Sequence, residues 1–506
     1  MSKKDMVYFN GLDITTGKYV TPPIPVEAFA AFVQKQIQQA QAPQTPEARA
    51  PEGVAGVMPA MPAPAAGPAF EAEKAEKLEE AGWGVIFAPN TKPEIVAALR
   101  PLLDRRKGQA GSRYKKYTWR KGETADQFLC RNGVTPGQVD PDQVPYYLLI
   151  VADPVAISYD CQFDLDVKRA VGRIYFKTRK EYQNYARAVV AAEKAAETGA
   201  STVPRRAVVF APAMDPDTKG SRTYLAIPLA RMLRAKHPAW KVNAITGAAA
   251  TKARLGQVLC GTDSADPAAL VFTASHGGAT PSGNGSQLKL QGCLVCQGLD
   301  RSKIGTSSYN PADFYFSGED IADSVRLSPM ITFHFACFGA GTPKFDDFLP
   351  VDATLTGDGA PPPKDKWAPK PFVAYLPQRL LRGGALATVG HVDRAWSFTF
   401  NTERQDIETI EDTVTAIMNG GRVGHAMQVF AERYSELSEQ LAKDKPALAM
   451  VATVQGRPVA RGLPKAPPKL SARDAAVWTA CRDARNYVIL GDPAVRLPLA
   501  PLPPAP

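Results

Sequence analysis

Short apolar runs alternate with amphipathic segments along most of this chain. Helices are expected at residues 93–104 and 180–197, and between most of the later apolar runs. The apolar runs themselves predict strands near 84–88, 146–152, 207–211, 240–246, 269–275, 331–337, 384–390 and 486–491. Alternation of this kind is typical of βαβ units built around a mostly parallel sheet. We therefore expect an α/β fold, with a mostly parallel sheet flanked by helices.

The pattern also divides the chain. The apolar periodicity is lost in the Pro- and Ala-rich stretch at residues 42–70, and such a composition predicts an extended linker. The phrases YYLLIVADP (146–154) and YVILGDP (487–493) share an apolar strand ending in Asp-Pro, which favours two related subdomains. The predicted parts are an N-terminal segment (1–41, with a short helix from 26), the linker (42–70), an N-terminal α/β subdomain (71–204) and a larger α/β subdomain (205–500) with a long loop (341–371).

Composition narrows the class of protein. The chain has 506 residues and is 45% hydrophobic, which is ample for a large core. No stretch approaches the roughly 20 apolar residues of a membrane span, and the first residues lack the apolar run of a secretory leader. Seven scattered cysteines do not form a disulfide framework. We expect a cytosolic protein with reduced thiols and no membrane partner.

The net charge of +10 makes nucleic acid a partner to consider. Basic residues are dispersed except at 104–121, where eight of them interleave with Tyr114, Tyr117 and Trp119. That composition suits a surface that tracks phosphates and stacks bases. It also suits a solvated basic loop. We favour the loop, and keep nucleic-acid binding as an alternative.

Two strand ends carry candidate chemistry. The run ALVFTASHGG leads an apolar strand into His276 and Gly277, and ITFHFACFGAG leads another into Cys337. Open α/β sheets place their sites at the carboxyl ends of their strands. If these strands are neighbours, a thiol and an imidazole meet at that edge.

The residue types explain what such a pair would do. An ionised cysteine is a strong nucleophile, and a nearby imidazole takes its proton and later protonates the leaving amine. Glycine leaves its backbone N–H unshielded, so the N–H groups of Gly277 and Cys337 are candidates for an oxyanion hole. Each motif alone also has a structural explanation, because strand-end cysteines are often small buried hydrophobes. The two together in this context favour catalysis.

These phrases resemble a known family. FTASHG (272–277) and FACFGAGTP (335–343) resemble the His-Gly and Ala-Cys strand ends of caspase, gingipain and CHAT-domain cysteine peptidases. YYLLIVADP followed by AVGRIYF is similar to gingipains, and with NYVILGDPAVRLP the resemblance covers roughly 80–497. It implies a caspase-haemoglobinase-like fold and a peptidase dyad of His276 and Cys337. It also implies synthesis as a zymogen.

The resemblance further points to a specificity pocket. In gingipains the region matching SYDCQFDLD (158–166) contributes to that pocket, so Asp160, Asp164 and Asp166 are candidates to face a cationic P1 side chain. They are equally well explained as solvated loop carboxylates. Trp396 resembles, in its place after the strand that follows the catalytic cysteine, a tryptophan that forms one wall of the gingipain pocket. The expected cleavage is after Arg or Lys.

Other cysteines and histidines have weaker support as functional residues. Cys293 and Cys296 form a CxxC without a second pair or histidines at zinc spacing. His334 precedes Cys337 by an odd number of strand positions, so we interpret it as a core histidine. His391 could border the cleft, although packing is the simpler role. No nucleotide-binding motif is present, and the expected enzyme uses no cofactor.

The sequence thus predicts a cytosolic cysteine endopeptidase. Its partners would be protein substrates and an activating protease or regulator. By analogy with the family alone, bacterial defence, including antiviral defence, or death signalling would suit it. The alternatives are an inactive caspase-like scaffold and a nucleic-acid-binding protein.

Overall fold

The structure is a computed structural model. It describes residues 6–7, 10–25, 28, 30–31, 70–200, 203–261, 267–345, 367–396, 405–444 and 471–500. The predicted linker, Phe70 excepted, most of the predicted helix from residue 26, and residues 346–366 of the predicted loop lie outside these ranges.

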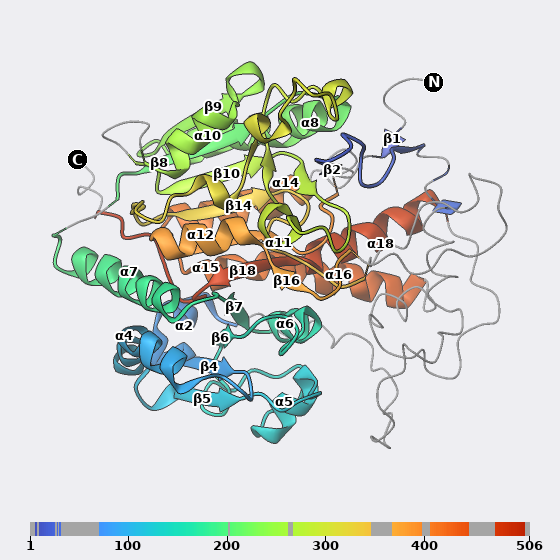
Figure 1. The fold of residues 1–506 in the computed structure, drawn as a ribbon. Coiled ribbons are helices and arrows are strands. Elements are labelled where there is room, and N and C mark those ends of the chain that lie inside the picture. Colours follow the sequence, from blue (N-terminus) through green and yellow to red (C-terminus); the bar gives the residue numbers. More distant parts are fainter. Residues whose placement is uncertain are drawn as a thin grey trace.

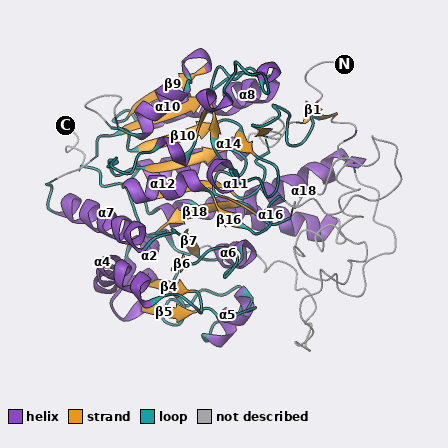
Figure 2. Ribbon diagram, viewed as in Figure 1, coloured by secondary structure: helices purple, strands orange, loops and turns teal. Residues whose placement is uncertain are grey.

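One ten-stranded sheet runs through the described part of the chain, with the order β5-β4-β6-β7-β18-β17-β14-β10-β8-β9. Figure 1 shows it extending from β9 to β5, and Figure 2 shows helices on both sides of it. The strands in sheet order are β5 (Tyr114–Thr118), β4 (Trp83–Phe87), β6 (Tyr147–Val151), β7 (Ala170–Ile174), β18 (Tyr487–Gly491), β17 (Ala387–His391), β14 (Ile331–Phe335), β10 (Leu270–Ala274), β8 (Arg206–Ala211) and β9 (Lys241–Thr246).

All neighbouring strands in this sheet are parallel except β17 and β18. The fold predicted from the sequence, a mostly parallel sheet flanked by helices, is confirmed. β7 pairs with β18, so hydrogen bonds join the strands of 71–204 to those of 205–500. Whether the two halves are separate folding units stays a prediction.

The apolar strands are buried on both faces, as parallel strands covered by helices must be. In β8, Val209 belongs to the apolar cluster that includes residues of α4, α7, α9, α14 and α16, whereas Val208 packs with α10 and α12. This alternation places a helical layer on each face. The helices of the first layer are α4 (Pro93–Ala110), α7 (Arg179–Glu197), α9 (Ile227–Lys236), α14 (Gln405–Met418) and α16 (Gln428–Asp444), and those that pack with Val208 are α10 (Lys252–Leu259) and α12 (Tyr375–Gly383). Two more helices, α5 (Ala125–Arg131) and α6 (Tyr159–Asp166), cover the half of the sheet from β4 to β7. The last, α18 (Ala472–Arg485), packs against α16.

Capping residues fix where several helices begin. Thr178 forms a capping box with Glu181 at the start of α7, close to the predicted start at residue 180. Thr124 and Gln127 do the same for α5. Each box satisfies two backbone N–H groups that the first helical turn would leave unpaired. The predicted helix at 93–104 is longer in the structure and continues to Ala110 as α4.

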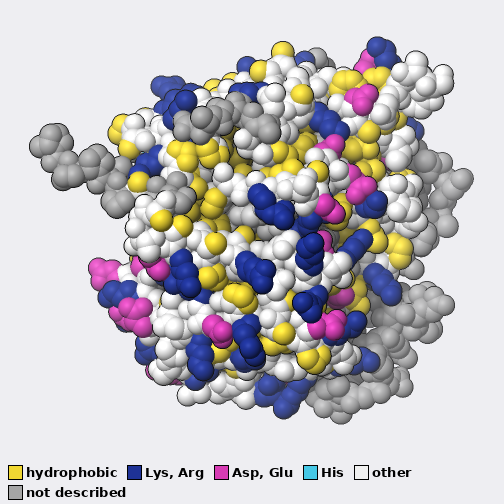
Figure 3. Space-filling view, turned by 60° about the vertical axis from the view of Figure 1, so that its left-hand side comes forward, with side chains coloured by type: hydrophobic (Ala, Val, Ile, Leu, Met, Phe, Trp, Pro, Cys, Tyr) yellow, Lys and Arg dark blue, Asp and Glu magenta, His cyan; other side chains and the backbone are white. Residues whose placement is uncertain are grey.

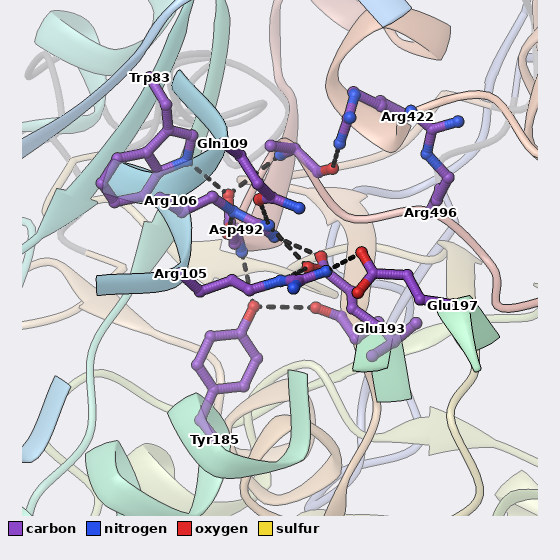
Figure 4. A network of polar contacts seen from close by, with 12 residues as sticks. Trp83, Arg105, Arg106, Gln109, Tyr185, Glu193, Glu197, Arg422, Asp492 and Arg496 are labelled. Carbon is purple, nitrogen blue, oxygen red and sulfur yellow. Dashed lines mark hydrogen bonds and ion pairs between the residues drawn. The ribbon is translucent and has the colours of Figure 1, made fainter. Parts of the chain in front are cut away.

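A buried polar network binds the end of β18 to the N-terminal half (Figure 4). Asp492, fully buried, accepts hydrogen bonds from Trp83 Nε1 at 2.9 Å and Arg106 Nε at 2.7 Å. Arg106 also pairs with Glu193 of α7 at 2.6 Å. The Asp-Pro that follows β18 is therefore a structural anchor in which each buried charge has a partner.

The basic stretch at 104–121 is not a loop, and that prediction is wrong. It forms the end of α4, a short 3-10 turn and β5, an edge strand of the sheet. The sequence YKKYT of β5 places lysines where an edge strand often carries them, since charge there discourages further pairing. Trp119 is buried, 2% exposed, and so is not a stacking platform.

The N-terminal residues belong to the architecture as well. β2 (Gly11–Asp13) lies at the edge of a second sheet with the order β13-β12-β11-β2. The other strands of that sheet are β13 (Tyr315–Phe316), β12 (Leu294–Val295) and β11 (Gly277–Ala279). β1 (Met6–Val7) pairs with β3 (Ile24–Pro25). In the part of the chain that the structure describes, no helix has the length and apolar character of a membrane span.

Candidate active site

The two strand ends predicted to carry chemistry are neighbours. β10 and β14 pair in parallel with Ala274 opposite Phe335, so His276 and Cys337 each follow their strand by two residues. Both side chains are fully buried. The structure therefore brings the predicted imidazole and thiol to the same edge of the sheet.

The turn after Cys337 has an unusual backbone. Phe338 and Asp393 are the non-glycine residues with positive φ in the described chain, at 58° and 81°. The N–H of Phe338 donates to the carbonyl of Asp393 at 2.6 Å, so each holds the other's segment. Strain of this kind persists only where the surroundings impose it. The positive φ angles shape the turn at Phe338 and the segment from Asp393 to Ala395. Both lie beside the thiol, since Ala395 N–H donates to Cys337 Sγ at 3.2 Å.

His276 is held by two carboxylates that follow β8. Its Nε2 lies 2.8 Å from Asp215 Oδ2, and its Nδ1 lies 3.4 Å from Asp217 Oδ2. Burial lowers the pKa of His276, but the charge and hydrogen bond of Asp215 outweigh burial and raise it. For Asp215, burial raises the pKa, but the charge and hydrogen bond of His276, together with hydrogen bonds from Thr218, outweigh burial and lower it. The pair favours an imidazolium at this site.

Reasoning from the sequence missed Asp215. The signal was present, because strand 207–211 runs into APAMDPD and thus ends in carboxylates. β8 is the neighbour of β10 in the sheet, so its end lies beside His276. Asp215 is also the N-cap of α8 (Pro216–Gly220), which fixes the position of its carboxylate.

The predicted oxyanion-hole donors converge on one oxygen. The N–H of Gly277 donates to the carbonyl oxygen of Asn10 at 3.0 Å, and the N–H of Cys337 donates to the same oxygen at 3.3 Å. Glycine is required at 277, because a Cβ there would lie 1.7 Å from the Cys337 carbonyl oxygen. Two backbone donors on one carbonyl are the arrangement that stabilises a tetrahedral oxyanion.

Residues of the N-terminal segment thus lie against His276 and Cys337. The N–H of Asn10 donates to the carbonyl of Ala395 at 3.0 Å, and β2 pairs in parallel with β11 immediately after it. Tyr19 returns along this segment and places its ring edge against His276, with centroids 5.7 Å apart. Arg301 lies over the Tyr19 ring and 3.6 Å from Asp215. These contacts cover the imidazole from solvent.

The predicted specificity carboxylates have other neighbours. Asp160 and Asp164 lie on α6 and pair with Arg485 at 3.8 and 3.0 Å. Asp166 accepts the backbone N–H of Val171 at 2.9 Å, and burial raises its pKa. Asn10 is the residue that the two oxyanion donors hold, and none of these three carboxylates takes part in its described hydrogen bonds. All three lie within the helix α6, and not in a loop as predicted.

Trp396 lies closer to the N-terminal segment. It is fully buried and packs in one apolar cluster with Val7 of β1 and Ile24 of β3. Its backbone N–H donates to Asp483 at 3.0 Å. Of the four residues predicted to bind substrate, Trp396 is therefore the one that packs against the N-terminal segment, through Val7 and Ile24.

The remaining candidates are structural. Cys293 and Cys296 are buried free thiols, and burial raises the pKa of Cys293 to about 12. His334 is a core histidine, as predicted: its Nδ1 lies 2.9 Å from Thr273 Oγ1, and burial lowers its pKa to about 3. The Nε2 of His391 lies 3.2 Å from Asp483 Oδ1.

Several basic side chains of 104–121 have acidic partners. Arg105 and Arg106 pair with Glu193, and Arg113 pairs with Asp142 at 2.7 Å. Figure 3 shows Lys and Arg side chains spread over one face of the molecule, with Asp and Glu among them. The positive charge on this face is therefore distributed rather than gathered in one patch.

Comparison with known proteins yields no match to a family model or to a curated protein. Among solved structures, one described as "Structure of Protease" is 11% identical and has a TM-score of 0.43, with 82% of this chain and 78% of that chain covered. The separase–securin complex of Saccharomyces cerevisiae is 10% identical, with a TM-score of 0.32. That match covers 69% of this chain and 15% of the other.

Proposed function

We propose that this chain is a cysteine endopeptidase with Cys337 as nucleophile and His276 as general base and acid. One observation carries the proposal. The N–H groups of Gly277 and Cys337 hold a single peptide carbonyl oxygen beside the Cys337 thiol. The same edge of the sheet holds an imidazole paired to a buried carboxylate. The similarity of both strand ends to those of caspase-like peptidases supports the same assignment.

The proposed roles follow from the residue types and from the position of both residues at one edge of the sheet. His276 would take the thiol proton, and Asp215, which lies 2.8 Å from its Nε2, would stabilise the imidazolium that results. The thiolate attacks the carbonyl carbon, and the charge that develops on its oxygen is stabilised by the two backbone donors. His276 then protonates the leaving amine. Hydrolysis of the thioester by water restores the thiol. No step needs a cofactor.

In the covered state the thiol is not primed. Burial, the largest influence, raises the pKa of Cys337 well above its usual value, and Asp217 raises it further. Cleavage of a separate substrate therefore requires the segment around Asn10 to leave its place between the oxyanion donors. This supports a zymogen or partner-activated enzyme, with scission in 42–70 or 341–371 as the routes that the sequence suggests. Action in the cytosol, in defence or death signalling, remains part of this proposal.

Substitution of Cys337 tests the function. Cys337→Ala and His276→Ala should each lower cleavage of a peptide library by about 10³-fold or more, because neither group has a substitute. Unchanged circular dichroism would show that the fold persists. Full activity in folded Cys337→Ala would refute the assignment. A folded native chain that cleaves nothing, before or after limited proteolysis, would favour the inactive scaffold.

A further inference from the structure

Asn10 occupies the position of a substrate residue. Its carbonyl oxygen lies between the two oxyanion donors, and its N–H donates to the carbonyl of Ala395 in the segment beside the thiol. Gly11 follows on the other side of that carbonyl. A Cβ at Gly11 would lie 3.1 Å from Cys337 Sγ, so the thiol is in close contact with this residue. The peptide bond between Asn10 and Gly11 is therefore the one presented to the nucleophile.

We propose that the enzyme cleaves its own chain between Asn10 and Gly11, and that its S1 site accepts an uncharged amide side chain. This inference rests on the proposed function and names a substrate and a processing site for it.

The chain holds this bond on both sides. After the bond, Gly11, Leu12 and Asp13 pair with Gly277, Gly278 and Ala279 of β11, and Leu12 is fully buried. Before it, Met6 and Val7 pair with Pro25 and Ile24, and Val7 packs in the cluster of Trp396. Preorganisation of this kind converts a bimolecular attack into an intramolecular one.

The side chain of Asn10 defines what S1 accepts. It is fully buried, and its Nδ2 donates to the carbonyl of Phe335 at 3.2 Å. Among the described residues, no acidic side chain bonds to this amide, and its Oδ1 has no hydrogen-bond partner. A lysine or arginine that kept the contact of this amide would meet a carbonyl and no carboxylate, and a buried charge without a counterion is costly. The site therefore suits asparagine better than the Arg or Lys expected from the sequence.

The chemistry balances as a hydrolysis. Cys337 Sγ attacks the carbonyl carbon of Asn10, and the C–N bond to Gly11 breaks. The thiol proton passes through His276 to the new amine of Gly11. Water then hydrolyses the thioester, which leaves a carboxylate on Asn10 and restores the thiol. The products are a peptide that ends at Asn10 and a chain that begins at Gly11.

The test is intact-mass analysis and N-terminal sequencing of the full chain, native and Cys337→Ala, under denaturing conditions. We expect a new N-terminus at Gly11 in the native protein and none in Cys337→Ala. The chain supplies its own control, because three more Asn-Gly bonds follow Asn132, Asn284 and Asn419. Spontaneous chemical cleavage would affect these bonds too and would persist in Cys337→Ala, an outcome that overturns the proposal.

Two variants test the side chain. Asn10→Lys should slow self-cleavage by about tenfold or more, because it buries an unpaired charge. Asn10→Gln keeps the amide and should slow it less. Faster cleavage of Asn10→Lys than of the native chain would overturn the S1 assignment.

Peptide digestion separates this inference from the proposed function. Self-cleavage at Gly11 together with cleavage of library peptides after asparagine supports both. An intact N-terminus in a chain that cleaves library peptides would overturn the inference and leave the peptidase standing. No cleavage of either substrate would overturn both.

Discussion

The Nε2 of His276 lies 2.8 Å from Oδ2 of Asp215, and the residues come from neighbouring strands of the sheet. Asp215 is itself fixed as the N-cap of α8, where its carboxylate accepts the N–H of Thr218 at 3.0 Å. A carboxylate held in this way fixes the ring and favours its protonated form. It is a positioning residue for the proposed base.

Asp215→Asn should lower kcat/KM by about 10²-fold or more, because the amide cannot stabilise an imidazolium. It should also change the pH dependence of stability. The pKa of His276 is raised above 6.5 and that of Asp215 is lowered below 3.8. The ion pair therefore contributes fully between roughly pH 4 and 6.5, and its contribution is lost as the pH rises through the raised pKa of His276.

Urea unfolding of both proteins across this range would measure the difference. The gap in unfolding free energy should be largest in mildly acidic solution and shrink in alkaline solution. Asp142→Asn is the control, since that carboxylate pairs with Arg113 at the surface. Parallel pH profiles of native protein and Asp215→Asn would contradict the ion pair.

Gly277→Ala should abolish most activity. The added methyl would lie 1.7 Å from the Cys337 carbonyl oxygen and 2.8 Å from its nitrogen, so the two segments must separate. Loss of one oxyanion donor costs about 10²–10³-fold in kcat. The nearby Gly285→Ala should be neutral, because nothing lies within 4 Å of its Cβ position. Steady-state kinetics of the two variants would decide, and equal activity would exclude Gly277 N–H as a donor.

Asp492→Ala should lower the free energy of unfolding by about 3–5 kcal/mol, because it leaves Arg106 with an uncompensated part of its buried charge. Arg113→Met removes an ion pair at the surface and should change it by less than about 1 kcal/mol. Denaturant titration measures both effects. A small loss in Asp492→Ala would mean that Glu193 alone satisfies Arg106.

The strands of the sheet were predictable because their apolar runs are continuous. The strands at 147–151, 270–274 and 331–335 each carry buried side chains on both faces, which leaves a clear signal in the sequence. β5 was missed because an edge strand buries few of its side chains and its lysines resemble a solvated stretch. Its sequence YKKYT shows no strict alternation of apolar and polar residues that could have marked it as a strand.

The candidate site was predictable where the residue type or its motif is unusual. His276, Cys337 and Gly277 stand out for that reason. Asn10 does not, because it joins the site through its backbone carbonyl and N–H, which every residue possesses. Its placement depends on contacts with residues more than 250 positions away, such as Gly277 and Cys337, which no local pattern encodes. The same holds for Arg485, which pairs with Asp160 and Asp164 only after α18 folds against the first half.

β18 has a consequence for the order in which the molecule is assembled during synthesis. It lies between β7 and β17 in the sheet, yet it is translated after the other nine strands of that sheet. Until residues 487–491 leave the ribosome, β7 and β17 are unpaired edges, and the sheet exists as two separate pieces. Exposed edges of this kind invite wrong pairing, so nascent chains paused before β18 should depend on chaperones. The segment around Asn10, which lies against Cys337, is by contrast translated before β10 and β14 and is already available when those strands emerge.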